Sequence, residues 1–242
     1  MKKIIVMCVM VAGLVLPAAA EDIGFTSSLF SQEEFNSFIK EFGAGISFNP
    51  MAPAEPLGMI GFDVAVEAVL TDISDGKPYW MNMISDNNPH PFLPAPRIHV
   101  MKGLPFGIDI GAIYSQVPGY NIQLWGIEAK YAILEGSIAT PALSIRGSYS
   151  QLDGVDDIDL NTQSIDLTIS KGLLMLTPYA GVSVLWINGG ENSPLVDLED
   201  ADETVFRGIL GLQMSPLPFV VITGEATLGD VAQYGLKIAI RF

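Results

Sequence analysis

The nonapeptide YGLKIAIRF, residues 234–242, alternates between large apolar residues and small or charged ones. Its apolar set consists of Tyr234, Leu236, Ile238, Ile240 and Phe242. Two cations, Lys237 and Arg241, stand among the intervening residues. Because successive side chains of a strand point to opposite faces, one face is apolar with an aromatic residue at each end, and the other is polar. A tilted strand of about 9–11 residues crosses a bilayer, so this stretch predicts a membrane-spanning strand.

The same alternation recurs along most of the chain, as in MIGFDVAVEAVL at 59–70 and FGIDIGAIY at 106–114. The predicted strands are 58–71, 93–102, 105–116, 120–134, 140–151, 159–171, 177–188, 203–214, 217–228 and 231–242. Most exceed the five or six residues usual in soluble proteins. We therefore predict an all-β fold, a closed antiparallel transmembrane β-barrel of about 10 strands over residues 58–242, with a short N-terminal amphipathic helix.

The connections and the aromatic residues support a barrel with two different ends. Short turns punctuated by Gly and Pro alternate with a set that includes the long polar connections 72–92, 152–158 and 189–202. Outer-membrane barrels combine short periplasmic turns with longer outer loops. Aromatic residues of the apolar faces fall near both ends of the strands, as at the two interfaces of a bilayer. A soluble β-sandwich would also alternate, but it gives no reason for this sorting.

Composition and the first residues indicate export. The chain is 49% hydrophobic and only 16% charged. Residues 1–20 predict a cleaved signal peptide, with Lys2 and Lys3 before an apolar run and an A-x-A site ending at Ala20. The single cysteine, Cys8, lies inside that run. Removing the peptide leaves a net charge of 10 − 27 = −17, which disfavours nucleic acid as a partner.

The last strand also carries a resemblance. Tyr234, Leu236, Ile238, Ile240 and Phe242 resemble the C-terminal β-signal of Gram-negative outer-membrane β-barrel proteins, a strand of alternate apolar residues with a terminal Phe. The resemblance covers the signal peptide and the architecture of 58–242, and it points to no narrower family. It implies export through a cleaved signal peptide, passage with periplasmic chaperones, insertion by the barrel-assembly machinery, and residence in outer-membrane lipid and lipopolysaccharide.

Residues 21–57 do not alternate and predict an N-terminal periplasmic segment with a helix at 32–42. Ser31 and Glu34 have the spacing of a capping box. Gly43 is expected to end the helix, because glycine is common at helix C-termini. The apolar stripe consists of Phe35, Phe38, Ile39 and Phe42. Such a helix could pack at the periplasmic mouth, enter the lumen as a plug, or lie on the inner leaflet. A lumen of this size has little room beyond its own side chains, which argues against deep insertion.

Alternation also places charged residues inside the barrel. The predicted lumen-facing polar residues are Asp63, Glu67, Arg97, His99, Asp109, Glu128, Lys130, Arg146, Asp166, Arg207, Glu225, Lys237 and Arg241. Acids and bases are equal in number in this set, apart from the histidine. One interpretation is a charge-paired core that fills a narrow barrel. The other is a narrow pore without strong ion selectivity.

The predicted outer loops are rich in acidic residues. Solvation of long loops is one explanation, and divalent-cation binding, including bridging to lipopolysaccharide phosphates, is another. DGVDDID at 153–159 offers Asp153, Asp156 and Asp157 as weak metal candidates, because it lacks the spacing and terminal Glu of a calcium loop. We expect no cofactor.

These features favour a passive function over a catalytic one. We expect a narrow pore for small solutes or a structural barrel. The alternative is a surface interaction or adhesion protein that acts through its acidic and aromatic outer loops. An outer-membrane hydrolase using His90 and Asp86 is a weaker hypothesis, because the chain lacks the common hydrolase motifs. The sequence names no solute.

Overall fold

The alternating segments pair into a closed antiparallel barrel, which confirms the predicted fold class. The structure is a computed structural model that describes residue 25 and residues 30–83, 89–116 and 122–242. The predicted signal peptide lies outside these residues. The strands are β1 (Phe62–Asp72), β2 (Phe92–Leu104), β3 (Ile108–Gln116), β4 (Gln123–Leu134), β5 (Ala142–Asp153), β6 (Ile158–Ser170), β7 (Leu176–Glu191), β8 (Ala201–Leu217), β9 (Val220–Gly229) and β10 (Gln233–Arg241).

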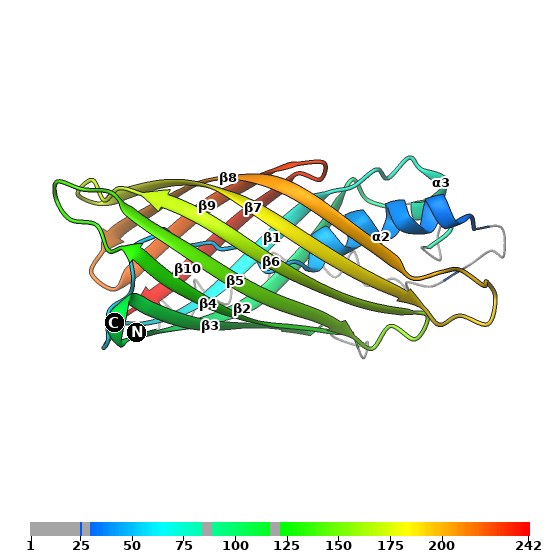
Figure 1. Cartoon of the computed structure of the whole chain (residues 1–242), viewed down its shortest axis with the longest axis horizontal. Coiled ribbons are helices and arrows are strands. Elements are labelled where there is room, and N and C mark those ends of the chain that lie inside the picture. Colours follow the sequence, from blue (N-terminus) through cyan, green and yellow to red (C-terminus); the bar gives the residue numbers. More distant parts are fainter. Residues whose placement is uncertain (1–24, 26–29, 84–88, 117–121) are drawn as a thin grey trace.

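Each strand pairs with its neighbours in the sequence, and β1 pairs with β10 to close the ring. At this seam Glu67 lies opposite Lys237 and Leu70 opposite Tyr234. Pairing of the first and last strands leaves no free edge in the sheet. Figure 1 shows the strands tilted around the barrel, with the short turns at one end and the longer connections at the other.

The two faces of the wall differ as the alternation predicts. On β10, Leu236 and Tyr234 are exposed on the outer face, whereas Lys237 and Ala239 are buried inside. Outward aromatic residues occur near both ends of the wall, as with Tyr131 near the short turns and Phe206 near the long loops. An apolar belt with aromatic margins suits a lipid environment.

Two helices and one 3-10 turn accompany the wall: α2 (Gln32–Ile46), α3 (Pro78–Met81) and η1 (Pro105–Gly107). The capping box at Ser31 and Glu34 is confirmed. The helix was expected to end before Gly43, but it continues to Ile46. A Cβ on Gly43 would lie 2.2 Å from Ile187 Cγ2, and one on Gly45 2.5 Å from Leu93 Cδ2. These glycines therefore allow close approach to the wall. No helix in the described part of the chain is long and apolar enough to cross a membrane.

The N-terminal segment does not pack at the short-turn mouth. That placement was the first of the three considered from the sequence, and the small lumen argued against the second, deep insertion. Instead α2 lies within the end of the barrel that carries the long connections, beside α3 (Figure 1). Gln32 donates a hydrogen bond of 2.9 Å to the Glu199 carbonyl in the β7–β8 loop. Residues 47–57 then run through the lumen toward the short turns, where Gly103 N–H donates to the Gly61 carbonyl.

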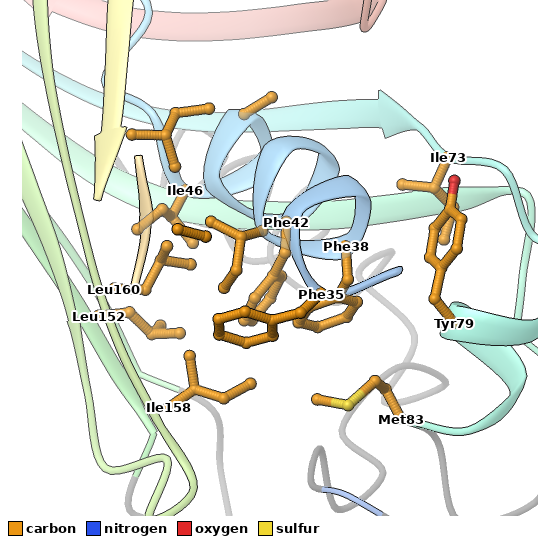
Figure 2. Packing of buried hydrophobic residues seen from close by; sticks show 14 of the residues in the cluster. Phe35, Phe38, Phe42, Ile46, Ile73, Tyr79, Met83, Leu152, Ile158 and Leu160 are labelled. Carbon is orange, nitrogen blue, oxygen red and sulfur yellow. The ribbon is translucent and has the colours of Figure 1, made fainter. Parts of the chain in front are cut away.

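The helix sits at this mouth because the inner wall is apolar there. Phe35, Phe38 and Phe42 pack against inward-facing residues of the wall and of the β1–β2 loop (Figure 2). The strands contribute Leu124, Leu152, Ile158, Leu160, Leu185, Ile187, Ala201 and Val205 to this cluster, and the β9–β10 connection contributes Val231. Burial of these groups against the helix is favourable because it removes apolar surface from water.

We predict that Gly43→Ala destabilises the barrel by about 1–3 kcal/mol, because its Cβ overlaps Ile187 in a packed region. Alanine is otherwise the better helix residue by up to about 1 kcal/mol, so a loss identifies packing as the cause. Gly76→Ala is the matched control, since nothing lies within 4 Å of a Cβ there. The measurement is the midpoint of urea unfolding in lipid. Equal midpoints for the two variants would contradict the observed docking of α2.

Candidate functional site in the barrel lumen

The lumen is filled by residues 47–57, which we call the plug. Its residues from Ser47 to Ala54 are buried, and it contains no helix or strand. A buried backbone without secondary structure must find other partners for its N–H and C=O groups. Pro50, Pro53 and Pro56 reduce this demand because proline has no N–H. The remaining groups are met largely by side chains of the wall.

At the helical end, the wall donates to the backbone carbonyls. The Ser150 hydroxyl donates to the Ile46 carbonyl at 2.9 Å. Arg97 donates to the Ser47 carbonyl at 2.9 Å, and Arg146 donates to the Phe48 carbonyl at 2.8 Å. The chain that follows α2 therefore lies directly beside cationic side chains of the wall.

Nearer the short turns, acidic and hydroxyl groups accept from the backbone amides of the plug. Met51 N–H donates to Glu225 at 2.9 Å, and Leu57 N–H donates to Asp109 at 3.1 Å. Ala54 N–H donates to the Ser170 hydroxyl at 2.9 Å.

Lys130 completes the contacts at this end. Its ammonium donates to the Pro53 carbonyl at 3.1 Å and to the Glu55 carbonyl at 3.0 Å. Both signs of charge thus hold the plug in place.

A charge network surrounds the plug at mid-barrel. Arg97 pairs with Glu67, and Arg146 pairs with both Glu128 and Asp166. His99 bridges the two halves of this network, with Nδ1 at 3.1 Å from Glu67 Oε2 and Nε2 at 3.1 Å from Glu128 Oε1.

Phe48 of the plug lies at the centre of this network. Its ring centroid is 4.7 Å from the guanidinium carbon of Arg146 and 5.7 Å from that of Arg97. The ring also makes an edge contact with His99, with centroids 5.0 Å apart. Stacking of a guanidinium on an aromatic face is favourable, so the plug is part of the network rather than a filler beside it.

All the predicted lumen residues lie on the inner face. Twelve are buried, namely Asp63, Glu67, Arg97, His99, Asp109, Glu128, Lys130, Arg146, Asp166, Arg207, Glu225 and Lys237. The side chain of Arg241 is 26% exposed at the short-turn end.

Three further ion pairs lie toward the short turns. Lys130 Nζ is 3.0 Å from Asp109 Oδ2. Asp63 contacts Arg241 at 2.8 Å and Lys237 at 3.6 Å.

Two of the predicted lumen residues, Glu225 and Arg207, do not form the ion pairs expected of a self-paired core. Glu225 accepts from Met51 N–H and, at 2.7 Å, from the Tyr179 hydroxyl. Arg207 donates to the hydroxyls of Ser47 and Ser183, each at 3.0 Å. Both side chains therefore serve to hold the plug.

Glu41 of α2 joins the helix to the β1–β2 loop. Its carboxylate accepts from Trp80 Nε1 at 2.6 Å and from the Tyr79 hydroxyl at 3.0 Å. It also accepts from the backbone N–H and hydroxyl of Ser74. Burial raises the pKa of the Tyr79 phenol, and the Glu41 carboxylate adds to this rise. Trp80 packs on Phe38 with centroids 4.8 Å apart, so these loop aromatics cover the helix.

Two of the three weak metal candidates have other partners. Asp153 accepts from Trp125 Nε1 at 2.9 Å, and Asp157 accepts from Phe25 N–H at 3.1 Å. Among the described residues no group of acids and histidines is arranged to hold a metal ion. His90 is exposed, and its hypothetical partner Asp86 lies outside the described residues, so the hydrolase hypothesis stays a prediction.

Sequence reasoning missed the residues that complete the site. Phe48 and Asn49 belong to a stretch with no periodicity. The amide group of Gln233 links α2 to the wall through a 2.8 Å hydrogen bond to the Ala44 carbonyl. A signal was present in VLWI at 184–187, where both faces of a strand are apolar. An apolar inner face near a long loop indicates that something apolar covers it.

Comparison with known proteins adds similarity of architecture only. No protein-family model and no curated protein matches this sequence. The crystal structure of Ail, the attachment invasion locus protein of Yersinia pestis, is 13% identical, with 76% of this chain and 99% of that chain covered and a TM-score of 0.32. The KdgM porin in complex with disordered oligogalacturonate is 9% identical over 74% and 99% of the two chains, with a TM-score of 0.38.

A third similar structure is the N-terminal β-barrel domain of Pseudomonas aeruginosa OprF. It is 13% identical over 76% of this chain and 99% of that chain, with a TM-score of 0.34. At such low identities and TM-scores these likenesses carry no argument about function. The barrel described above rests on its own strand pairing.

We predict that Arg146→Met lowers the free energy of unfolding by about 3–5 kcal/mol, because it removes the buried cation that pairs with Asp166 and leaves Glu128 with His99 alone. Lys77→Met, in an exposed loop, is the control and should have little effect. Urea unfolding in lipid vesicles measures both. A network that does not contribute to the fold would give the two variants the same midpoint.

Proposed function

We propose that this protein is a Gram-negative outer-membrane β-barrel sealed by its own plug, and that it acts at its long-loop mouth rather than as an open pore. The membrane location is supported by the closed wall with its apolar outer belt. We further propose that the last strand, ending in Phe242, is the assembly signal read by the barrel-assembly machinery. Export through a cleaved signal peptide and contact with lipopolysaccharide belong to the same proposal.

The observation that carries the sealed state is the contact of wall charges with the backbone of the plug. Arg97, Arg146 and Lys130 donate to its carbonyls, while Glu225 and Asp109 accept from its amides. An open conduit would have these groups solvated by water. Here they are buried and directed to the plug, which favours a barrel that does not conduct in this state.

The long-loop mouth is the part left for interaction. It presents the polar face of α2 together with acidic loops, and Lys40 of the helix pairs with Glu203 of β8 at 3.1 Å. A groove of about 560 Å³ lies beside the helix and is lined partly by Glu33, Asn36 and Asp230. This surface favours the interaction hypothesis over the open-pore hypothesis.

A second candidate is a gated conduit. The plug makes no strand pairs with the wall, and the wall closes without it. Release of the plug would therefore leave an intact ring lined by the charged residues. This candidate requires an opening signal, whereas the sealed barrel does not.

We predict that the full chain shows no steady conductance in planar bilayers, because the plug fills the lumen. A variant that lacks residues 21–57 should conduct, since it lacks both α2 and the plug and its lumen is lined by charged groups at mid-barrel. Heat-modifiable migration on a gel confirms that each preparation is folded. Steady conductance of the folded full chain would contradict the sealed barrel, and brief openings of the full chain would favour the gated conduit.

A further inference from the structure

Large apolar side chains are exposed at the tips of the short turns. Phe106 between β2 and β3 is 87% exposed, and Ile138 between β4 and β5 is 102% exposed. Leu174 between β6 and β7 is 108% exposed, and Phe219 between β8 and β9 is 64% exposed. We call these four residues the apolar rim. Turn tips in water usually carry Gly, Asn, Asp or Ser, so this composition needs an explanation.

The backbone conformation at the rim supports the same conclusion. Phe106 and Phe219 have φ of 67°, and Leu174 has φ of 55°. Left-handed φ is uncommon for bulky residues and is normally met by Gly or Asn. Three strained turns that each present a large apolar side chain indicate that the side chains have a role outside the fold.

The rim surrounds the whole barrel. Neighbouring strands in the ring follow the sequence, so the four turns lie one after another along its circumference. Ile60, between the plug and β1, is 86% exposed and occupies the remaining sector beside the closing strands. A docked protein would cover one sector of such a ring. A lipid surface meets every sector at the same depth.

Two lysines support the turns of this ring. Lys171 Nζ donates to the carbonyls of Ser137, Ile138 and Thr140 at 2.8–3.1 Å. Lys102 Nζ donates to the carbonyls of Met59 and Gly61 at 2.8 and 3.1 Å. Each ammonium group thus lies beside an exposed isoleucine. Apolar tips with adjoining cations suit the region where acyl chains meet headgroup phosphates.

The rim is continuous with the apolar belt of the wall. The Phe219 ring lies 6.3 Å from the ring of Phe242, the outward-facing aromatic residue that follows β10. The long-loop mouth differs, because its loops carry acidic residues at sites such as Asp156, Asp157 and Asp200. Among the described residues, exposed large apolar side chains beyond the ends of the strands are therefore more numerous at the short turns than at the long loops.

We propose that the apolar rim is embedded in the phospholipid headgroup and upper acyl region of the inner leaflet, so that the short turns anchor the barrel at a fixed depth instead of projecting into the periplasm. This inference rests on the proposed membrane location and adds the position of the turns to it. Each rim side chain contacts lipid rather than water. This contact accounts for the exposure of the side chain on the protein surface.

Spin labels on single cysteines test this directly, because the only cysteine of the chain lies in the predicted signal peptide. The barrel with its plug is reconstituted in vesicles of phosphatidylethanolamine and phosphatidylglycerol. Labels are placed with Ile138→Cys and Leu174→Cys in the rim. Val182→Cys on the outer face of β7 serves as the lipid reference, and Gly76→Cys in the β1–β2 loop serves as the water reference. Collision rates with oxygen and with a water-soluble nickel chelate report the depth of each label.

We expect both rim labels to collide with the nickel chelate several-fold less often than the Gly76→Cys label, and with oxygen nearly as often as the Val182→Cys label. Nickel collision rates equal to those at Gly76→Cys would overturn the proposal and leave the rim as a surface for a soluble partner or a second copy. Because Ile138 has no left-handed φ, its label decides the question even where a change at Leu174 alters the turn. A water-exposed Val182→Cys label would instead refute the membrane location itself.

Discussion

The need to satisfy a buried backbone without secondary structure governs this molecule. A plug that forms neither helix nor strand cannot pair its own N–H and C=O groups, and an unpaired buried polar group is costly. The wall meets this need with charged and hydroxyl side chains from six strands, namely β2, β3, β4, β5, β6 and β9. The inward charges thus have two tasks, to neutralise one another and to bind the backbone of the plug. Glu225 shows the second task most clearly, because it accepts from Met51 N–H and from the neutral Tyr179 hydroxyl. Arg207 holds the plug through a side chain instead, the Ser47 hydroxyl.

The two ends of the lumen are built by different physics. At the long-loop end the inner wall is apolar, and α2 is held by burial of its phenylalanine face and by glycines that permit close contact. At the short-turn end the wall is polar, and the narrower plug is held by hydrogen bonds. An amphipathic helix followed by a proline-rich extended chain matches this change from an apolar to a polar lining. The helix comes first in the sequence and lies at the mouth, and the extended chain follows it deeper into the lumen.

Much of the fold was predictable because alternation is a local signal. Strand positions and the direction of each side chain follow from a period of two residues. The pairing of β1 with β10 follows from closure of the ring. The position of the plug was not predictable in the same way. The stripe of Phe35, Phe38 and Phe42 requires an apolar partner but does not say which mouth supplies it. The apolar partner of this stripe is the part of the wall that contains Leu185 and Ile187, where the alternation of polar and apolar residues fails. Gly189 is a second indication of this contact, since a Cβ there would lie 2.6 Å from Ile39.

The account depends most on the claim that the wall holds the backbone of the plug. Residue-resolved amide hydrogen exchange, measured by NMR on the barrel in lipid nanodiscs, tests that claim at Met51, Ala54 and Leu57. The N–H groups of these residues donate to Glu225, Ser170 and Asp109. We expect them to exchange as slowly as amides in the middle of β10. Exchange as fast as that of the exposed loop amide of Gly76 would contradict a plug fixed in the lumen.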